Sequence, residues 1–174
     1  MRKHNFIAIV LSLFLIVPSV AAHGGDGITK WTLIIPAASL IGALILVGGM
    51  WRSQGSRLSM LNYAVAGLIV ITGLMHIAIG IQAEDILLLA NGVGYMVLGA
   101  LRYMPLPTLD NVRQLTGFAL VPYILVTIAG YFILHEGVDV LGLINKVIEV
   151  VLLAGLLLEL MRFPVYQERQ LQSV

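Results

Sequence analysis

The chain alternates between long apolar runs and short polar segments, and the apolar runs have the length of membrane-spanning helices. A helix needs about 20 mostly apolar residues to cross the hydrocarbon core of a bilayer. Runs of this kind cover residues 32–50, 59–81, 86–103, 115–135 and 139–161. The third run is the shortest and holds several small residues. We therefore predict an all-α, polytopic bundle of about five transmembrane helices, with its third helix the least regular.

A shorter apolar run at the N-terminus has the features of an export signal. Basic residues precede this run, Pro18 breaks it and the small residue Ala22 ends it. We predict that residues 1–22 are a cleaved signal peptide, which makes His23 the first mature residue and 23–31 an extracytoplasmic segment. The alternative is that the run is retained as a first anchoring helix.

The basic residues predict the orientation of the spans. With residues 23–31 outside, the inner loops, inner helix ends and tail hold six arginines and the outer side holds only Lys30. The six are Arg52, Arg57, Arg102, Arg113, Arg162 and Arg169. Cytoplasmic segments carry such an excess of Lys and Arg. We expect a multi-pass protein of the plasma membrane whose tail, 162–174, is cytoplasmic.

Composition narrows the classes of partner. The chain is 59% hydrophobic and 11% charged, against about 25% charged for a soluble domain, so its main partner is the lipid bilayer. Its net charge is +1 and its basic residues are scattered, which excludes nucleic-acid binding. The absence of cysteine excludes disulfides, iron–sulfur clusters and thiolate metal sites.

Small residues in the second span predict where another helix packs. Ala66, Gly73 and Gly80 recur every seven residues, and small side chains let the backbones of membrane helices approach closely. His76 lies on the same face as these residues and should point into the bundle.

Polar residues inside the spans gather in the half of the membrane predicted to be the outer one. They predict a one-sided pocket made of His76, Asn91, Tyr95, Tyr131, His135, Asn145, Lys146 and Glu149. Lys146 and Glu149 are three residues apart and can pair. Their ion pair either pins the fifth helix to the bundle or belongs to a ligand or proton pathway. The inner half is expected to be aliphatic, with Glu159 and Arg162 as a solvated pair at its boundary.

Histidine supplies the candidate metal ligands. A free amine and imidazole at His23 would form a chelate for copper, which His76 or His135 could complete. The start Ala22-His23-Gly24 resembles the mature N-terminus of the exported subunit of membrane copper monooxygenases. His76 and His135 are also the only histidines on the spans, but their depths differ by about one to two turns, which disfavours a shared haem b.

The segment from Gly73 to Glu149 resembles small uncharacterised multi-spanning membrane proteins of archaea and bacteria. The matching features are His76, the run Leu89 to Tyr95, the tyrosines Tyr123 and Tyr131, and the pair Lys146 and Glu149. The resemblance implies a helical membrane fold and no particular activity.

No catalytic triad, phosphate-binding loop or paired-carboxylate motif occurs, so we assign no catalytic residue. The first functional hypothesis is a non-catalytic accessory or scaffold subunit that contacts other membrane subunits through its glycine-rich faces. The second is an outward-facing membrane protein that binds copper or a small ligand. A small transporter or redox protein is the third.

Overall fold

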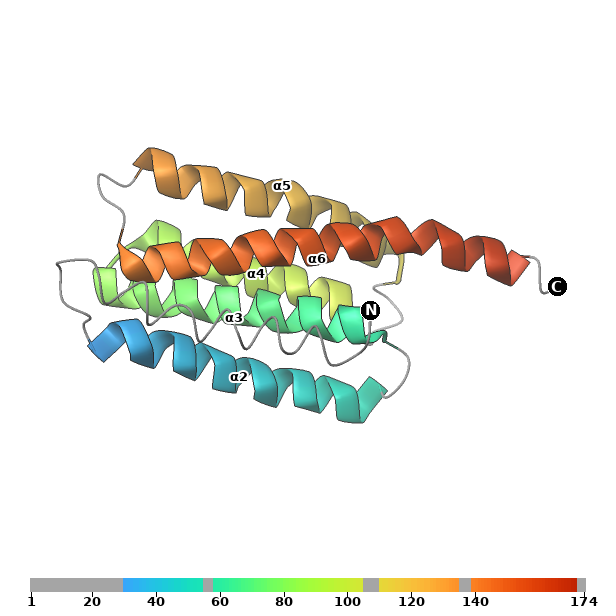
Figure 1. Ribbon diagram of the computed structural model, residues 1–174, viewed down its shortest axis with the longest axis horizontal. Coiled ribbons are helices and arrows are strands. Elements are labelled where there is room, and N and C mark those ends of the chain that lie inside the picture. Colours follow the sequence, from blue (N-terminus) through green and yellow to red (C-terminus); the bar gives the residue numbers. More distant parts are fainter. Residues whose placement is uncertain (1–29, 55–57, 105–109, 135–138, 172–174) are drawn as a thin grey trace.

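The computed structural model describes residues 30–54, 58–104, 110–134 and 139–171, apart from the side chains of 110, 111 and 162–171 (Figure 1). Five α-helices make up this part of the chain, and it contains no strand. They are α2 (Lys30–Gln54), α3 (Met60–Ala83), α4 (Ile86–Tyr103), α5 (Asp110–Leu134) and α6 (Val140–Leu171). All five are long and apolar enough to cross a membrane, so the chain is a multi-pass integral membrane protein and the predicted all-α bundle is confirmed.

Two helices are longer than the apolar runs that predicted them. α5 begins at Asp110, five residues before the predicted start at 115, and α6 continues to Leu171 instead of ending at 161. An acid suits the first turn of a helix, and the glutamine, glutamate, arginine and leucine residues after 161 favour helix in any solvent. Hydrophobicity therefore gives the membrane-spanning part of a helix but underestimates its full length.

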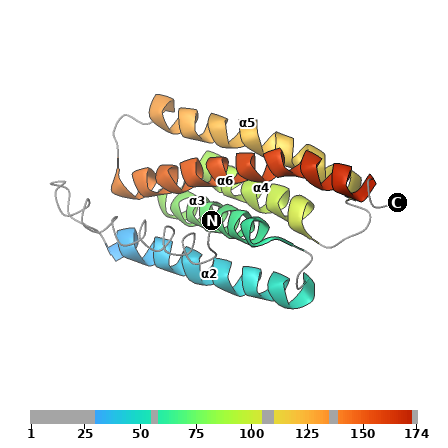
Figure 2. The same ribbon diagram turned by 45° about the vertical axis from the view of Figure 1, so that its right-hand side comes forward.

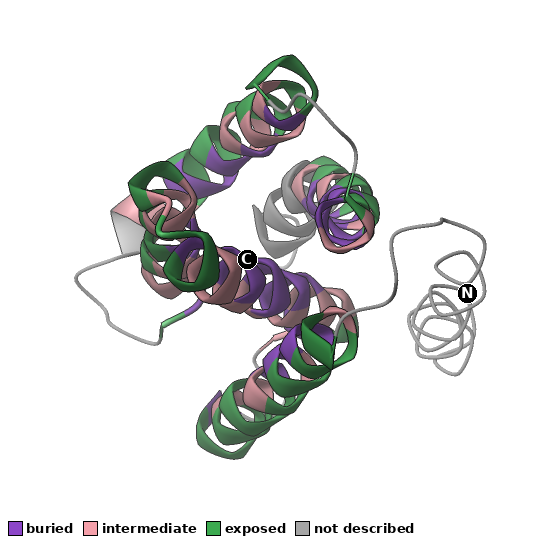
Figure 3. Cartoon of the chain, turned by 90° about the vertical axis from the view of Figure 1, so that its left-hand side faces the viewer, coloured by how far each residue is buried: buried purple, intermediate pink, exposed green. Residues whose placement is uncertain are grey.

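Four of the helices form a ring. α3 packs on α4, α4 on α5, α5 on α6 and α6 on α3, while α2 packs mainly on the outer side of α3. In two views α2 and α5 lie at opposite edges of the bundle (Figures 1 and 2). Seen end-on, the buried strips of the helices face one another and the exposed strips face outward (Figure 3). The outward strips are rich in large apolar residues, as lipid contact requires.

The closest helix pair is α3 and α4, and glycines make it possible. A Cβ atom at Gly92 would lie 2.6 Å from the carbonyl oxygen of Gly73 and 2.7 Å from the backbone nitrogen of Ile77. A Cβ atom at Gly80 would lie 2.5 Å from the backbone nitrogen of Leu89. The predicted small-residue stripe of the second span is therefore confirmed as the face on which α4 packs.

The connection between α3 and α4 is short enough to hold the two helices as a hairpin. Glu84 ends α3 in the left-handed conformation, with φ 53°, and Asp85 begins α4 by accepting hydrogen bonds from the backbone nitrogens of Leu87 and Leu88. Such caps satisfy backbone groups that the helix itself leaves unpaired. The turn brings His76 on α3 and Tyr95 on α4 to the same level, with ring centroids 5.6 Å apart.

The close α3–α4 contact gives a stability prediction. Gly92→Ala should lower the free energy of unfolding by about 1 to 3 kcal/mol, because the new methyl group meets backbone atoms that cannot turn aside. Gly48→Ala on α2 is the matched control, since no atom lies within 4 Å of its Cβ position. Thermal unfolding in detergent measures both. A Gly92→Ala variant as stable as Gly48→Ala would show that the two helices do not pack this closely.

Candidate functional site

The ring of four helices encloses a pocket at one end of the bundle. It has a volume of about 620 Å³, within the range of small-molecule sites, and lies where α3 and α5 end and α4 and α6 begin. Most of the accessible area of its wall is apolar, although nine of the 17 residues that line it are polar or charged. The polar and charged residues that line it are His76, Asp85, Asn91, Tyr123, Thr127, Tyr131, Asp139, Asn145 and Lys146.

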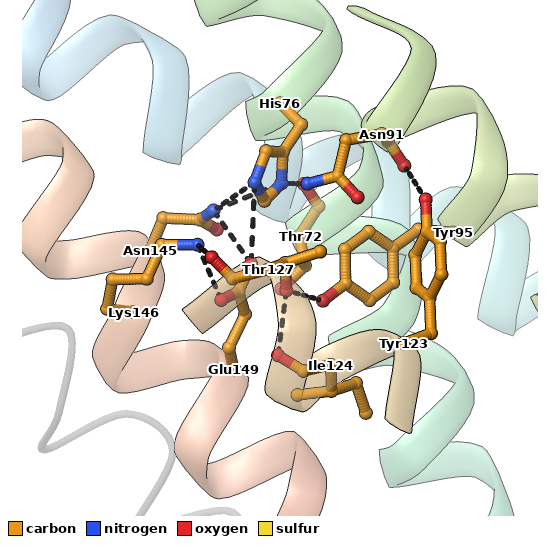
Figure 4. A network of polar contacts seen from close by, with 10 residues as sticks. All are labelled: Thr72, His76, Asn91, Tyr95, Tyr123, Ile124, Thr127, Asn145, Lys146 and Glu149. Carbon is orange, nitrogen blue, oxygen red and sulfur yellow. Dashed lines mark hydrogen bonds and ion pairs between the residues drawn. The ribbon is translucent and has the colours of Figure 1, made fainter. Parts of the chain in front are cut away.

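A buried ion pair lies at the base of the pocket (Figure 4). Lys146 Nζ donates to Glu149 Oε2 at 2.6 Å and to the carbonyl oxygen of Thr127 on α5 at 3.3 Å. Residues three apart on a helix share a face, which explains why α6 can form the pair by itself. Glu149 is fully buried and Lys146 is 5% exposed, so each charge depends on the other for compensation.

His76 extends this network from α3. Its Nδ1 lies 3.0 Å from the carbonyl oxygen of Thr72, an acceptor, which favours a proton on Nδ1. The amide nitrogen of Asn145 lies 3.1 Å from Nδ1 and 3.3 Å from Nε2. Nε2 also lies 3.4 Å from Glu149 Oε1, which brings His76 next to the ion pair of α6.

Tyrosines build the rest of the wall. The hydroxyl of Tyr95 shares a hydrogen bond of 2.8 Å with Thr127 Oγ1, and Tyr123 donates to the carbonyl oxygen of Asn91 at 2.9 Å. The rings of Tyr95 and Tyr123 meet edge to face with centroids 5.0 Å apart. These contacts tie α4 to α5 beside the ion pair (Figure 4).

Tyr131 covers the pocket on its α6 side. Its hydroxyl donates to the backbone oxygen and to Oδ2 of Asp139, both at 3.3 Å, and its ring lies 5.5 Å from Lys146 Nζ. The ring also rests on Gly142, where a Cβ atom would come within 2.5 Å of it. A glycine at this position is therefore required to seat the tyrosine.

One buried polar atom in the pocket has no partner. Asn145 is 1% exposed and lines the pocket, and its Oδ1 accepts no hydrogen bond, although Nδ2 bonds to His76 and Glu149. Buried polar atoms are nearly always hydrogen-bonded, because an unpaired one loses its hydration and gains no hydrogen bond inside the protein. Asn145 Oδ1 is thus an unused hydrogen-bond acceptor on a residue that borders the pocket.

A second buried cluster occupies the opposite end of the bundle, where the sequence predicted an aliphatic interior. Arg102 Nη2 donates to Glu159 Oε1 at 2.6 Å, and the hydroxyl of Tyr103 donates to Glu159 Oε2 at 2.6 Å. Asn62 on α3 donates to the same carboxylate at 2.9 Å. Glu159 is buried and joins three helices, so the prediction that it forms a solvated pair with Arg162 is wrong.

Arg102, which the sequence placed at the inner end of its helix, belongs to this cluster. It is 4% exposed and is held by Glu159 and the carbonyl oxygen of Arg113. Arg102 follows Tyr95 by seven residues and Asn91 by eleven, so the three residues share a polar face. The continuation of that polar face to the end of α4 was the signal for a second buried acid on a neighbouring helix.

The structure brings most of the predicted site residues together. His76, Tyr95, Asn145, Lys146 and Glu149 belong to one connected network. Asn91 and Tyr131 lie on the pocket wall.

The remaining histidines cannot be placed, because His23 and His135 lie outside the described residues. Within the described part of the chain no group of three or more His, Asp or Glu residues could hold a metal ion. His76 is the one histidine described, and it is hydrogen-bonded in the core. Copper binding at His23 and the disfavoured haem between His76 and His135 both stay predictions.

Comparison of the chain with protein-family models, with curated proteins and with solved structures finds no match. The two resemblances seen in the sequence therefore stay predictions, and functional inference rests on the geometry of the pocket and its polar network.

Proposed function

We propose that this membrane protein binds a small molecule in the pocket enclosed by α3, α4, α5 and α6. The observation that carries the proposal is the position of the buried network. An ion pair that served only to pin α6 to the bundle would need no cavity beside it. Here His76, Asn145 and Lys146 are buried and yet border a cavity of about 620 Å³. Convergent polar groups in a mainly apolar cavity are typical of ligand sites.

Pocket filling tests this proposal. Gly130 lines the pocket and has no atom within 4 Å of its Cβ position, so a side chain can begin there and Gly130→Phe should fill part of the cavity. Ala129→Phe is the matched control, because Ala129 is exposed on the neighbouring face of α5. Native mass spectrometry of protein from its own membranes should find a stoichiometric small-molecule adduct in the wild type and in Ala129→Phe. Gly130→Phe should lack it. An adduct that persists in Gly130→Phe would place the ligand elsewhere.

We also propose an orientation of the chain in the membrane. The excess of arginine on one side supports a C-terminus in the cytoplasm of a plasma-membrane protein, with the pocket at the outer end. Arg102 is buried, so it contributes less to the excess of basic residues on the inner side. Without it, five arginines (six minus one) lie on the inner side and Lys30 lies on the outer side. A reporter enzyme fused after Val174 should be active only if it functions in the cytoplasm. Activity of a reporter that requires export would contradict the orientation.

An accessory role in a larger membrane complex is the second candidate function. The observation that favours it is the open space beside two glycines of α2. Gly48 and Gly49 have no atom within 4 Å of their Cβ positions, and α2 packs mainly on α3. Small residues with open space beside them allow another membrane helix to approach. If α2 docks on a partner subunit, Gly49→Phe should abolish co-migration with larger proteins in a native gel.

A further inference from the structure

The pocket opens through its side wall. Leu87 on α4 and Val126 on α5 both line it, yet they are 70% and 69% exposed. Leu87 lies one turn before Asn91 and Val126 one turn after Tyr123, and Asn91 and Tyr123 join the two helices. Closer to the middle of the bundle the gap is shut, because the hydroxyl of Tyr123 bonds to the carbonyl oxygen of Asn91 and the ring of Tyr123 sits over Gly94. α4 and α5 therefore separate beside the pocket and meet below it.

This side opening runs inward from the boundary of the bilayer at this end of the bundle. Leu87 is the second residue of α4, at that boundary, whereas Val126 precedes the end of α5 at Leu134 by eight residues, which is about 12 Å along a helix axis. α4, which spans the bundle in 18 residues, is about 27 Å long, close to the hydrocarbon thickness of a bilayer. A molecule with a hydrocarbon chain can therefore enter from the lipid between Leu87 and Val126.

The charges around the pocket disfavour a charged head group. Among the residues that the structure describes, Lys146 is the only lysine or arginine that lines it, and Glu149 neutralises Lys146 from behind. Asp85 and Asp139 also line the pocket, so an anion would meet more negative than positive charge. A cation at the base would lie beside the Lys146 ammonium group. A neutral head group avoids both penalties.

The base of the pocket favours a head group that donates hydrogen bonds. Asn145 Oδ1 is buried without a partner and accepts, while Lys146 Nζ has one of its three protons uncommitted beyond Glu149 and Thr127. A hydroxyl group serves both, since it donates to the amide oxygen and accepts from the ammonium group.

We propose that the pocket takes a neutral amphiphile with a hydroxyl-bearing head group. The molecule moves in from the lipid between α4 and α5, places its head against Asn145 and Lys146, and leaves its hydrocarbon chain in the gap beside Leu87 and Val126. This inference rests on the proposed ligand-binding function and names the class of ligand.

Photo-crosslinking in nanodiscs of zwitterionic lipid tests the ligand class. Three diazirine probes of equal chain length are used: a monoacylglycerol, the matching fatty acid and the matching alkylammonium. The neutral probe should label peptides of α4 and α5 at least ten times more strongly than either charged probe. Excess unlabelled monoacylglycerol should compete, and glycerol should not. Asn145→Leu should weaken the neutral probe at least tenfold.

Two pairs of variants test the site and the route. Gly130→Phe should abolish labelling by the neutral probe, and Ala129→Phe should retain it. Val126→Trp, in the gap, should slow labelling at least tenfold. Leu125→Trp, which is exposed but does not line the pocket, should not. Thermal unfolding of each variant separates loss of binding from loss of folding.

The outcomes distinguish failure of the ligand class, failure of the route from the lipid and failure of the ligand-binding function. A charged probe that labels as well as the neutral one, and is lost in Gly130→Phe, overturns the neutral class while the ligand-binding function stands. Competition by glycerol, or labelling unaffected by Val126→Trp, overturns the route from the lipid. Labelling that Gly130→Phe does not change, together with an adduct-free wild type in native mass spectrometry, overturns both proposals.

Discussion

Lys146→Met should destabilise the protein more than the double change Lys146→Met with Glu149→Leu. The single change leaves a fully buried carboxylate without its 2.6 Å partner, and breaking a buried ion pair in this way costs about 3 to 5 kcal/mol. The double change removes both charges and leaves apolar side chains of similar size, which cores tolerate far better. Thermal or denaturant unfolding in detergent gives the ranking.

Glu149→Leu alone completes the cycle. It leaves Lys146 with the carbonyl oxygen of Thr127 as its remaining acceptor. This variant should therefore also lose more free energy of unfolding than the double change. The coupling between the two sites should be favourable by more than about 1 kcal/mol, as expected for residues in direct contact. Additive effects of the two single changes would mean that Lys146 and Glu149 have separate partners.

Glu159→Leu should be as damaging as either single change in the first network. Its carboxylate accepts from Arg102, Tyr103 and Asn62. The substitution leaves two neutral donors without an acceptor and a buried guanidinium with the carbonyl oxygen of Arg113 in place of its charged partner. We expect a loss of about 3 to 5 kcal/mol in the free energy of unfolding. The effect should fall on α3, α4 and α6 together, because one side chain joins all three.

Tyr103→Phe is the graded control for this substitution. It removes one hydrogen bond to Glu159 Oε2 and leaves the contact with Arg102 intact, so it should cost about 1.5 to 3 kcal/mol. The account of the cluster fails if Glu159→Leu proves no worse than Tyr103→Phe, since the carboxylate would then not be the common acceptor.

The fold was predictable because lipid imposes simple constraints. Backbone groups in a bilayer must be satisfied internally, so five apolar runs of spanning length had to be helices, including the short α4. The spacing of Ala66, Gly73 and Gly80 also gave the face of α3 on which α4 packs.

The site was predictable only in part. Residues about one turn apart on one helix, such as Lys146 and Glu149, could be paired from spacing alone. The contact between Arg102 and Glu159 could not, because it joins residues 57 apart and depends on the rotation of α4 relative to α6. The pocket itself was expected from the depth of its polar residues, but the gap beside Leu87 and Val126 depends on how far α5 tilts from α4, which no local pattern encodes.

An experimental density map of the chain purified from its own membranes tests the central claim most directly. We predict density for a bound molecule between α3, α4, α5 and α6, with its polar end within hydrogen-bond distance of Asn145 Oδ1. A map in which α5 packs on α4 along its whole length, with the space between Tyr131 and His76 filled by side chains, would contradict the account.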